Sequence, residues 1–153
     1  MSGVFARNRS ETELQFRVNA VELQIELTQY VMKEKVLPKK WRYGIGYPLI
    51  AKVDELVDNI VYANSIYPIE EKKETEEEKI EAKKQAINLL NLRKKYQTLA
   101  IANCFQIQNK LIRMLKCVET SNVKQLESII DRLSHEKDLL IAWRKKSKII
   151  EEK

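Results

Sequence analysis

Apolar residues recur every three or four positions in four segments of the chain, and polar stretches separate these segments. This spacing places the apolar side chains along one side of an α-helix. The first predicted stripe consists of Leu14, Val18, Val21, Ile25 and either Val31 or Met32. The second consists of Leu49, Ile50, Val53, Leu56, Val57, Ile60 and Val61. The third consists of Leu89, Leu92, Tyr96, Leu99, Ile107, Leu111, Met114 and Val118, with Asn103 as its polar step. The fourth consists of Val123, Leu126, Ile130, Leu133, Leu140 and Trp143.

Four amphipathic helices joined by short turns predict an all-α fold, an antiparallel up-down four-helix bundle in one domain over residues 1–153. The first helix is expected to begin at the capping box Ser10-Glu11-Thr12-Glu13, after a flexible basic start at residues 1–9. Pro38 ends this helix because proline cannot continue it. Pro48 suits the first turn of the second helix, although that helix could also start earlier and kink.

The boundaries of the last two helices rest on weaker local signals. Residues 69–81 form a charged run that is either a solvated linker or the exposed start of the third helix, and we expect a break before about Glu77. Ser121 or Asn122 is expected to cap the fourth helix. Gly44-Ile45-Gly46 lacks the preceding strand and third glycine of a phosphate-binding loop, so it indicates backbone slack or close packing.

Composition bounds the class of protein. The chain of 153 residues has 28 Lys or Arg and 22 Asp or Glu, a formal net charge of +6. It has no apolar run of about 18 residues and no hydrophobic signal region at its start, so we expect a cytoplasmic protein without a membrane span. Cys104 and Cys117 lie on one predicted helix, roughly 20 Å apart at helical rise, and are expected to be reduced.

The positive charge is concentrated on the third predicted helix. Residues 82–118 contain no Asp or Glu, but they contain eight Lys or Arg residues. Cations and amides alternate on the side opposite the apolar stripe, at Lys84, Asn88, Asn91, Lys95, Thr98, Ala102, Gln106, Asn109, Arg113 and Lys116. Lysine and arginine among amides can bind phosphates or an acidic protein groove, whereas the plainer alternative is a solvated helix face.

Two smaller basic clusters flank this helix. Lys39, Lys40 and Arg42 accompany Trp41 and Tyr43, a combination of charge and stacking surface that is found in single-strand RNA binding. The alternative is that both aromatic rings pack on the end of the bundle. The second cluster, Trp143-Arg144-Lys145-Lys146-Ser147-Lys148, either contacts a partner or only complements the dipole at the end of the fourth helix.

The sequence offers no set of residues suited to catalysis or to a metal. His135 is the only histidine, and Arg132 stands where a Glu-x-x-His motif of a di-iron bundle would need glutamate. Cys104, Cys117 and His135 match no zinc-site spacing. We therefore expect a binding protein with no catalytic residues, no metal and no cofactor.

Three stretches resemble the accessory variability determinant (Avd) proteins of diversity-generating retroelements, which belong to a wider group of four-helix proteins encoded in ribosomal-RNA intervening sequences. The first is Pro38-Lys39-Lys40-x-Arg42-Tyr43-Gly44 after the first helix. The second is Ile60-Val61-Tyr62-Ala63-Asn64 at the end of the second helix. The third is SNVKQLESIIDRL followed by Ala142-Trp143-Arg144-Lys145. The resemblance covers about residues 13–148.

The resemblance implies a small basic bundle that assembles into a homopentameric barrel. It also implies binding to the element's reverse transcriptase and template RNA, in support of mutagenic cDNA synthesis. Family members use arginines of the third helix, commonly in a repeated Leu-Arg pair. The closest positions here are Lys110 and Arg113, within Asn109-Lys110-Leu111-Ile112-Arg113 rather than a repeated pair.

Three functions are therefore compared: a retroelement accessory protein, a general RNA-binding bundle of the intervening-sequence type, and a structural helical scaffold. The expected binding residues for nucleic acid or reverse transcriptase are Lys110, Arg113, Lys116, Arg93, Lys94, Lys95, Lys84, Lys39, Lys40, Arg42, Arg144 and Lys145.

Overall fold

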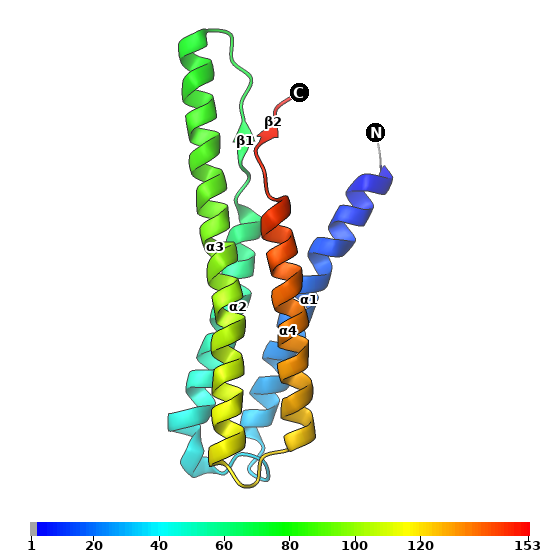
Figure 1. Cartoon of the computed structure of the whole chain (residues 1–153), viewed down its shortest axis with the longest axis vertical. Helices are drawn as coiled ribbons and strands as arrows, with labels where there is room; N and C mark the ends of the chain where they lie inside the picture. Colours follow the sequence, from blue (N-terminus) through cyan, green and yellow to red (C-terminus); the bar gives the residue numbers. More distant parts are fainter. Residues whose placement is uncertain (1–2) are drawn as a thin grey trace.

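The computed structural model describes the backbone of residues 3–153 and the side chains of residues 15–153. Its helices are α1 (Gly3–Met32), α2 (Tyr47–Ser65), α3 (Glu76–Cys117) and α4 (Val123–Lys146) (Figure 1). A 3₁₀ turn, η1 (Lys39–Trp41), and a π-helical turn, η2 (Arg42–Gly46), lead from α1 to α2. The chain is mostly helical and bundle-like, which confirms the all-α prediction. Helix α1 begins at Gly3, seven residues before the predicted start at Ser10, and the side chains of the predicted capping box lie outside those that are described.

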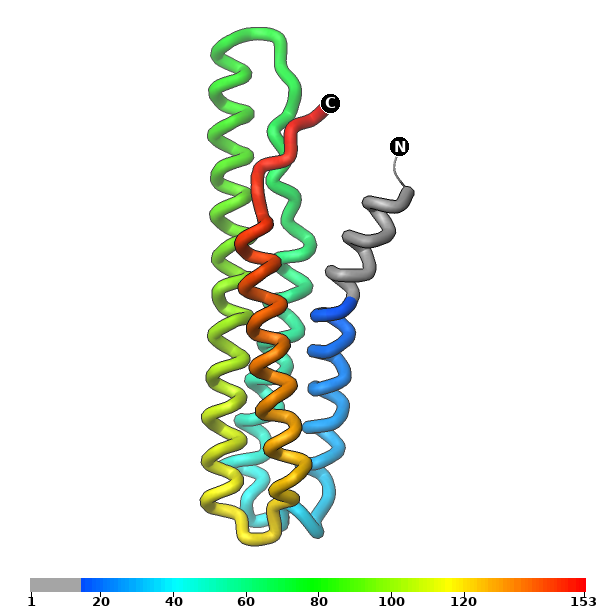
Figure 2. The backbone as a smooth tube through the Cα atoms, turned by 45° about the vertical axis from the view of Figure 1, so that its right-hand side comes forward, coloured from blue at the N-terminus to red at the C-terminus, as the bar shows by residue number. Residues whose placement is uncertain are grey.

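The two ends of the molecule are built differently. At one end lie the α1–α2 connection and the α3–α4 turn, which we call the turn end (Figure 2). The Thr120 hydroxyl donates a hydrogen bond to the Val36 carbonyl there, at 3.2 Å. Toward the other end, β1 (Ile69–Glu70) pairs in parallel with β2 (Ile150–Glu151), and α3 extends beyond them (Figure 1).

Helix α1 buries a different stripe from the predicted one. Phe16, Ala20, Leu23, Leu27 and Tyr30 are buried at alternating steps of four and three residues, whereas the predicted Val18 and Ile25 are 37% and 53% exposed. Of the two alternatives for the end of the predicted stripe, Val31 is buried and Met32 is 49% exposed. The prediction was wrong because this helix carries two apolar stripes. Residues two apart lie roughly 200° apart around a helix, so spacing alone cannot decide which stripe faces the core.

Helix α2 follows its prediction more closely. Leu49, Val53, Leu56 and Ile60 are fully buried, while Val61 is 42% exposed. Just before the helix, a Cβ atom on Gly46 would lie 2.7 Å from Val31 Cγ1 and 2.9 Å from Leu37 Cδ2. Gly46 therefore allows η2 to approach the end of α1 closely, which is the close packing that the sequence left as one of two readings. Gly44 faces open space.

Helix α3 begins close to the expected break. Thr75 is its N-cap, and its hydroxyl accepts a hydrogen bond from the Glu78 amide at 3.2 Å. The predicted stripe is correct from Ile107 to Val118. Before that point it is wrong at Leu89, Leu92 and Leu99, which are 36%, 40% and 40% exposed, whereas its polar step Asn103 is buried and Tyr96 is half-buried against the core. The other side chains that α3 buries before Ile107 are Ala82, Ala86, Gln97, Ala100, Ile101 and Cys104.

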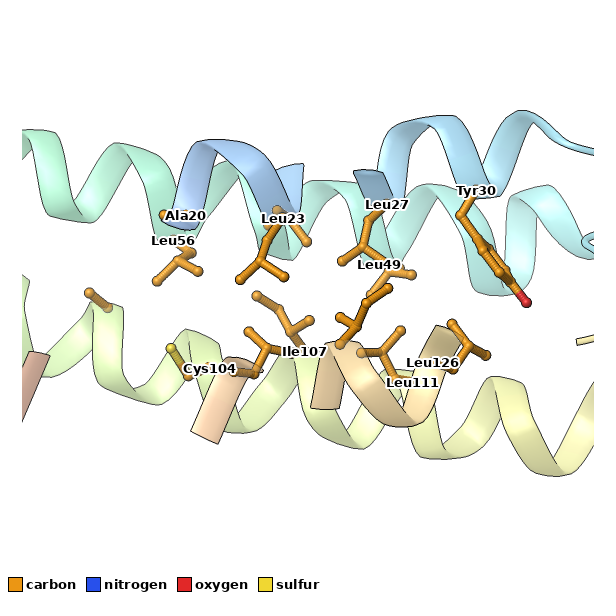
Figure 3. Packing of buried hydrophobic residues seen from close by; sticks show 14 of the residues in the cluster. Ala20, Leu23, Leu27, Tyr30, Leu49, Leu56, Cys104, Ile107, Leu111 and Leu126 are labelled. Atoms are coloured by element: carbon orange, nitrogen blue, oxygen red, sulfur yellow. The ribbon is translucent and has the colours of Figure 1, made fainter. Parts of the chain in front are cut away.

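Helix α4 closes the core. Asn122 is its N-cap and accepts from the Gln125 amide at 3.1 Å, which decides between the two expected caps. Leu126, Leu133, Leu140 and Trp143 are buried as predicted, whereas Val123 is 51% exposed and Ile130 is half-buried. Figure 3 shows how apolar side chains of the four helices meet in one core, with Leu23 and Leu27 opposite Ile107 and Leu111.

Candidate nucleic-acid interface

The outward side of α3 is the cation and amide ladder that the sequence predicts. Of its ten residues, Ala102 is half-buried and the other nine, from Lys84 to Lys116, are exposed. The absence of carboxylates between residues 82 and 118 means that no side chain of the same stretch neutralises these charges. The exposed lysines, arginine and amides of the ladder present hydrogen-bond donors to solvent.

The turn end combines this ladder with a second stretch that lacks carboxylates. Residues 35–53 contain no Asp or Glu and five cations. Because the α1–α2 connection and the C-terminal end of α3 lie at the same end of the molecule, the two acid-free stretches adjoin (Figure 1). Four exposed carboxylates flank them along the chain: Glu34 and Asp54 on either side of the first stretch, and Glu81 and Glu119 on either side of the second. The result is a local excess of positive charge, which attracts polyanions.

Three of the expected binding cations instead hold the fold together. The Arg93 guanidinium donates to the Ile66 carbonyl at 3.0 Å and lies 5.3 Å from the centre of the Trp143 ring. Arg42 donates to the Met32 carbonyl at 3.2 Å, at the C-terminus of α1. The Arg144 guanidinium donates to the Thr98 hydroxyl at 3.1 Å, linking α4 to α3. All three are half-buried, so their charge is only partly available to a partner.

The remaining expected residues form two separate groups. Lys39, Lys40, Arg113 and Lys116 are exposed at the turn end, with Lys110 half-buried beside them. Nearer the other end stand the exposed Lys84, Lys95 and Lys145 and the half-buried Lys94. Lys95 and Lys116 are 21 positions apart, which corresponds to about 30 Å of helix. The twelve residues therefore do not make one compact site.

The aromatic residues of the connection divide into packed and exposed ones. Trp41 is half-buried against the core, with Lys40 Nζ 5.6 Å from its ring centre. Tyr43 is 84% exposed, and its ring meets that of Tyr47 edge to face, with 5.4 Å between centroids. The packing alternative thus holds for Trp41 and fails for Tyr43. Sequence reasoning missed Tyr47, although its position four residues after Tyr43 was a usable signal.

A polar seam joins α2 to α3 and explains the interruption of the apolar stripe at Asn103. The Asn103 amide donates to Glu55 at 3.1 Å and to Gln106 at 3.0 Å, and its oxygen accepts from Asn59 at 2.7 Å. Glu55 also accepts from Lys52 at 3.0 Å. A buried amide needs partners, and this network supplies them. The seam consequently fixes the packing of α2 on α3 and is not free for a ligand.

Glu136 is the one acidic side chain that is fully buried among the described residues. Neither of its carboxyl oxygens has a hydrogen-bond partner in that part of the chain. Burial raises the pKa of Glu136 to about 8, and the nearby Asn19 side chain lowers it only in part. Burial, followed by the charge of Glu136, raises the pKa of the Cys104 thiol to about 12, so this thiol is unreactive at neutral pH.

The described residues contain no group of three or more His, Cys, Asp or Glu side chains that could hold a metal ion. His135 is exposed on α4, at a shallow, open depression that Glu127, Asp131 and Arg132 also line. Cys104 is buried and Cys117 exposed, and both are free thiols. Within residues 3–153, none of the helices combines the length and the apolar character that crossing a bilayer requires.

Comparisons with known proteins found no match for this chain. No family model matches it, and no curated protein and no solved structure gives a significant match.

Proposed function

We propose that this chain is a non-catalytic accessory protein of a diversity-generating retroelement, which binds the reverse transcriptase and template RNA in the cytoplasm. The observation that carries the proposal is the meeting of two acid-free, cation-rich stretches at the turn end. The family-like segment Pro38–Gly44 lies at this same end, and its Lys39 and Lys40 side chains are exposed. The last-helix motif supports the proposal as well, since Trp143 is buried against Phe16 at 4.5 Å between ring centroids.

The chemistry of this surface suits a backbone-directed contact with RNA. Lysine and arginine bind phosphate oxygens, and interleaved asparagine and glutamine donate to phosphate or sugar. Such contacts set position without reading sequence, so the protein would hold the template while the polymerase does the copying. Arg113 and Lys116 are the best placed of the α3 cations because they are exposed and lie at the same end of the molecule as Lys39 and Lys40.

We further propose that the helices form an antiparallel up-down bundle and that five copies assemble into a ring. The support is the second apolar stripe of α1. Val18, Ile25 and Met32 are large, exposed and separated by seven residues, and the half-buried Val21 lies between the first two. Apolar residues at this heptad spacing form the seam of helix–helix contacts, so an exposed seam suits a neighbouring subunit.

Charge reversal at the turn end tests the proposed function. The double variant Lys110→Glu and Arg113→Glu should abolish binding to the reverse transcriptase and reduce the slope of log K against log salt for RNA by about 2. The matched control is Lys72→Glu with Lys79→Glu, which changes the net charge equally on the acidic segment. An equal loss of binding affinity in both double variants would mean that the net charge of the protein, and not this site, accounts for binding.

A general RNA-binding bundle without a polymerase partner is the second candidate. The exposed ring of Tyr43 beside lysines favours it, because an aromatic surface next to cations serves RNA without any protein partner. The two candidates differ in one measurement: the second predicts RNA binding with no affinity for a reverse transcriptase. A scaffold whose cations are only solvated would bind neither, even at low salt.

A further inference from the structure

We propose that Tyr43 and Tyr47 form a stacking platform for unpaired bases of single-stranded RNA. This inference rests on the proposed RNA binding and adds the kind of RNA and the mode of contact.

The exposure of Tyr43 is imposed by the fold of the π-helical turn. Before Tyr43 in the chain, the Arg42 guanidinium donates a hydrogen bond to the Met32 carbonyl. After Tyr43, Ile45 is buried with 4% exposure. Gly46 then packs against Val31 and Leu37 at a distance that no larger residue could keep. With its neighbours anchored inward, Tyr43 is held outward on a well-fixed backbone.

Tyr47 makes the exposed ring a preorganised surface. The two rings come from positions four residues apart, where helical side chains are neighbours, and meet at an interplanar angle of 83°. Tyr47 is itself 41% exposed, so the pair offers two aromatic surfaces at right angles. A ring that is already supported at its edge loses little conformational freedom when a base stacks on it.

The positive charge around the Tyr43 and Tyr47 rings indicates which kind of ligand binds there. The surrounding stretch, residues 35–53, carries cations and no carboxylate, and the exposed Lys39 and Lys40 precede Tyr43 by four and three residues. An apolar peptide would gain nothing from these charges, whereas a nucleic acid strand presents phosphates together with aromatic bases. Bases that are paired in a duplex are stacked on each other and cannot use the ring, so the ligand is an unpaired strand.

The test compares two labelled oligonucleotides of roughly a dozen nucleotides by fluorescence anisotropy: a single-stranded RNA, and an abasic strand that keeps the phosphates. Tyr43→Ala should weaken binding of the RNA roughly 5- to 150-fold, the loss expected for one stacked base, and should leave the abasic strand unchanged. Tyr43→Phe should retain the wild-type affinity, since stacking does not need the hydroxyl.

The control is Tyr67→Ala, which removes a 56% exposed tyrosine beside β1, away from the turn end. It should bind both strands as the wild type does. If Tyr43→Ala binds the RNA as tightly as the wild type, the platform is refuted while the proposed RNA binding stands. If Tyr43→Ala lowers the affinity for both strands equally, the variant has changed the phosphate contacts or the folding of the protein, and the platform is refuted as well. A wild-type protein that binds neither strand at low salt overturns both the platform and the proposed function.

Discussion

Helix α3 has two halves that pack in different ways. Its second half, residues 100–117, lies between α2 and α4 and buries Ile107, Leu111 and Met114 completely. Its first part, residues 76–92, extends beyond the ends of the neighbouring helices and has the segment around β1 and β2 alongside it (Figure 1). There it buries only the alanines Ala82 and Ala86.

The difference shows what helical periodicity can and cannot decide. In the second half, α2 and α4 cover one face of α3 on both sides, and the apolar residues predicted from the spacing are the ones that this contact buries. In the first part, a thin linker allows only small side chains to approach closely, so Leu89 and Leu92 stay outside although their spacing suits a core. The neighbouring segments of the chain, and not the spacing of apolar residues, therefore determine which face of the helix is buried.

The largest expected effect is the difference in unfolding free energy between truncating a leucine in the second half of α3 and truncating one in the first part. Leu111→Ala should lower the free energy of unfolding by about 2–5 kcal/mol, because it removes a fully buried side chain and leaves a cavity. Leu92→Ala should change it by less than about 0.5 kcal/mol, because that side chain is 40% exposed. Urea unfolding followed by circular dichroism measures both, and similar losses in the two variants would contradict the distinction.

The contact of the second half of α3 with α4 should respond to pH through Glu136 of α4, which lies near Cys104 of α3. Its pKa in the folded state is about 8 against an ordinary value of 4.5, so the folded protein holds a proton that the unfolded chain has lost. The associated stability is present below about pH 4.5 and is lost as the pH rises toward 8. Between pH 6 and 8 the wild type should lose about 1–3 kcal/mol of unfolding free energy.

The matched variant for this prediction is Glu136→Gln, which keeps the size of the side chain and removes its titration. Urea unfolding at several pH values should show no such fall for the variant. If the wild type and the variant have parallel profiles, Glu136 does not titrate in this range.

The smallest expected effect is the loss of stability when the N-cap side chain of α3 or of α4 is removed. Thr75→Ala removes the hydrogen bond to the Glu78 amide, and Asn122→Ala removes that to the Gln125 amide. Each loss is worth about 1 kcal/mol locally. The Asn122 change should lower global stability because it touches the turn end, whereas the Thr75 change should only speed amide exchange in the first turns of α3. Hydrogen exchange distinguishes them, and global destabilisation by Thr75→Ala would be the contrary result.

The sequence was sufficient for the helical class, for the stripes of α2 and α4 in their main part, for the α3 stripe from Ile107 onward, and for the break before α3. It failed on α1 because Val18 and Ile25 are as apolar and as regular as Leu23 and Leu27. The sequence also indicated the outward cations of α3, since charge and spacing agree there. It could not show that Arg93 and Arg144 contact neighbouring segments, because those contacts come from residues 27 and 46 positions away.

The central claim is that this chain is an RNA-binding assembly, and light scattering across a salt series tests it most directly. The protein alone should have a mass of about five times 18.0 kDa, and adding a structured RNA at low salt should raise the mass in a way that is reversed by salt. A monomer of 18.0 kDa whose mass does not change with RNA at any salt concentration would contradict both the assembly and the proposed function.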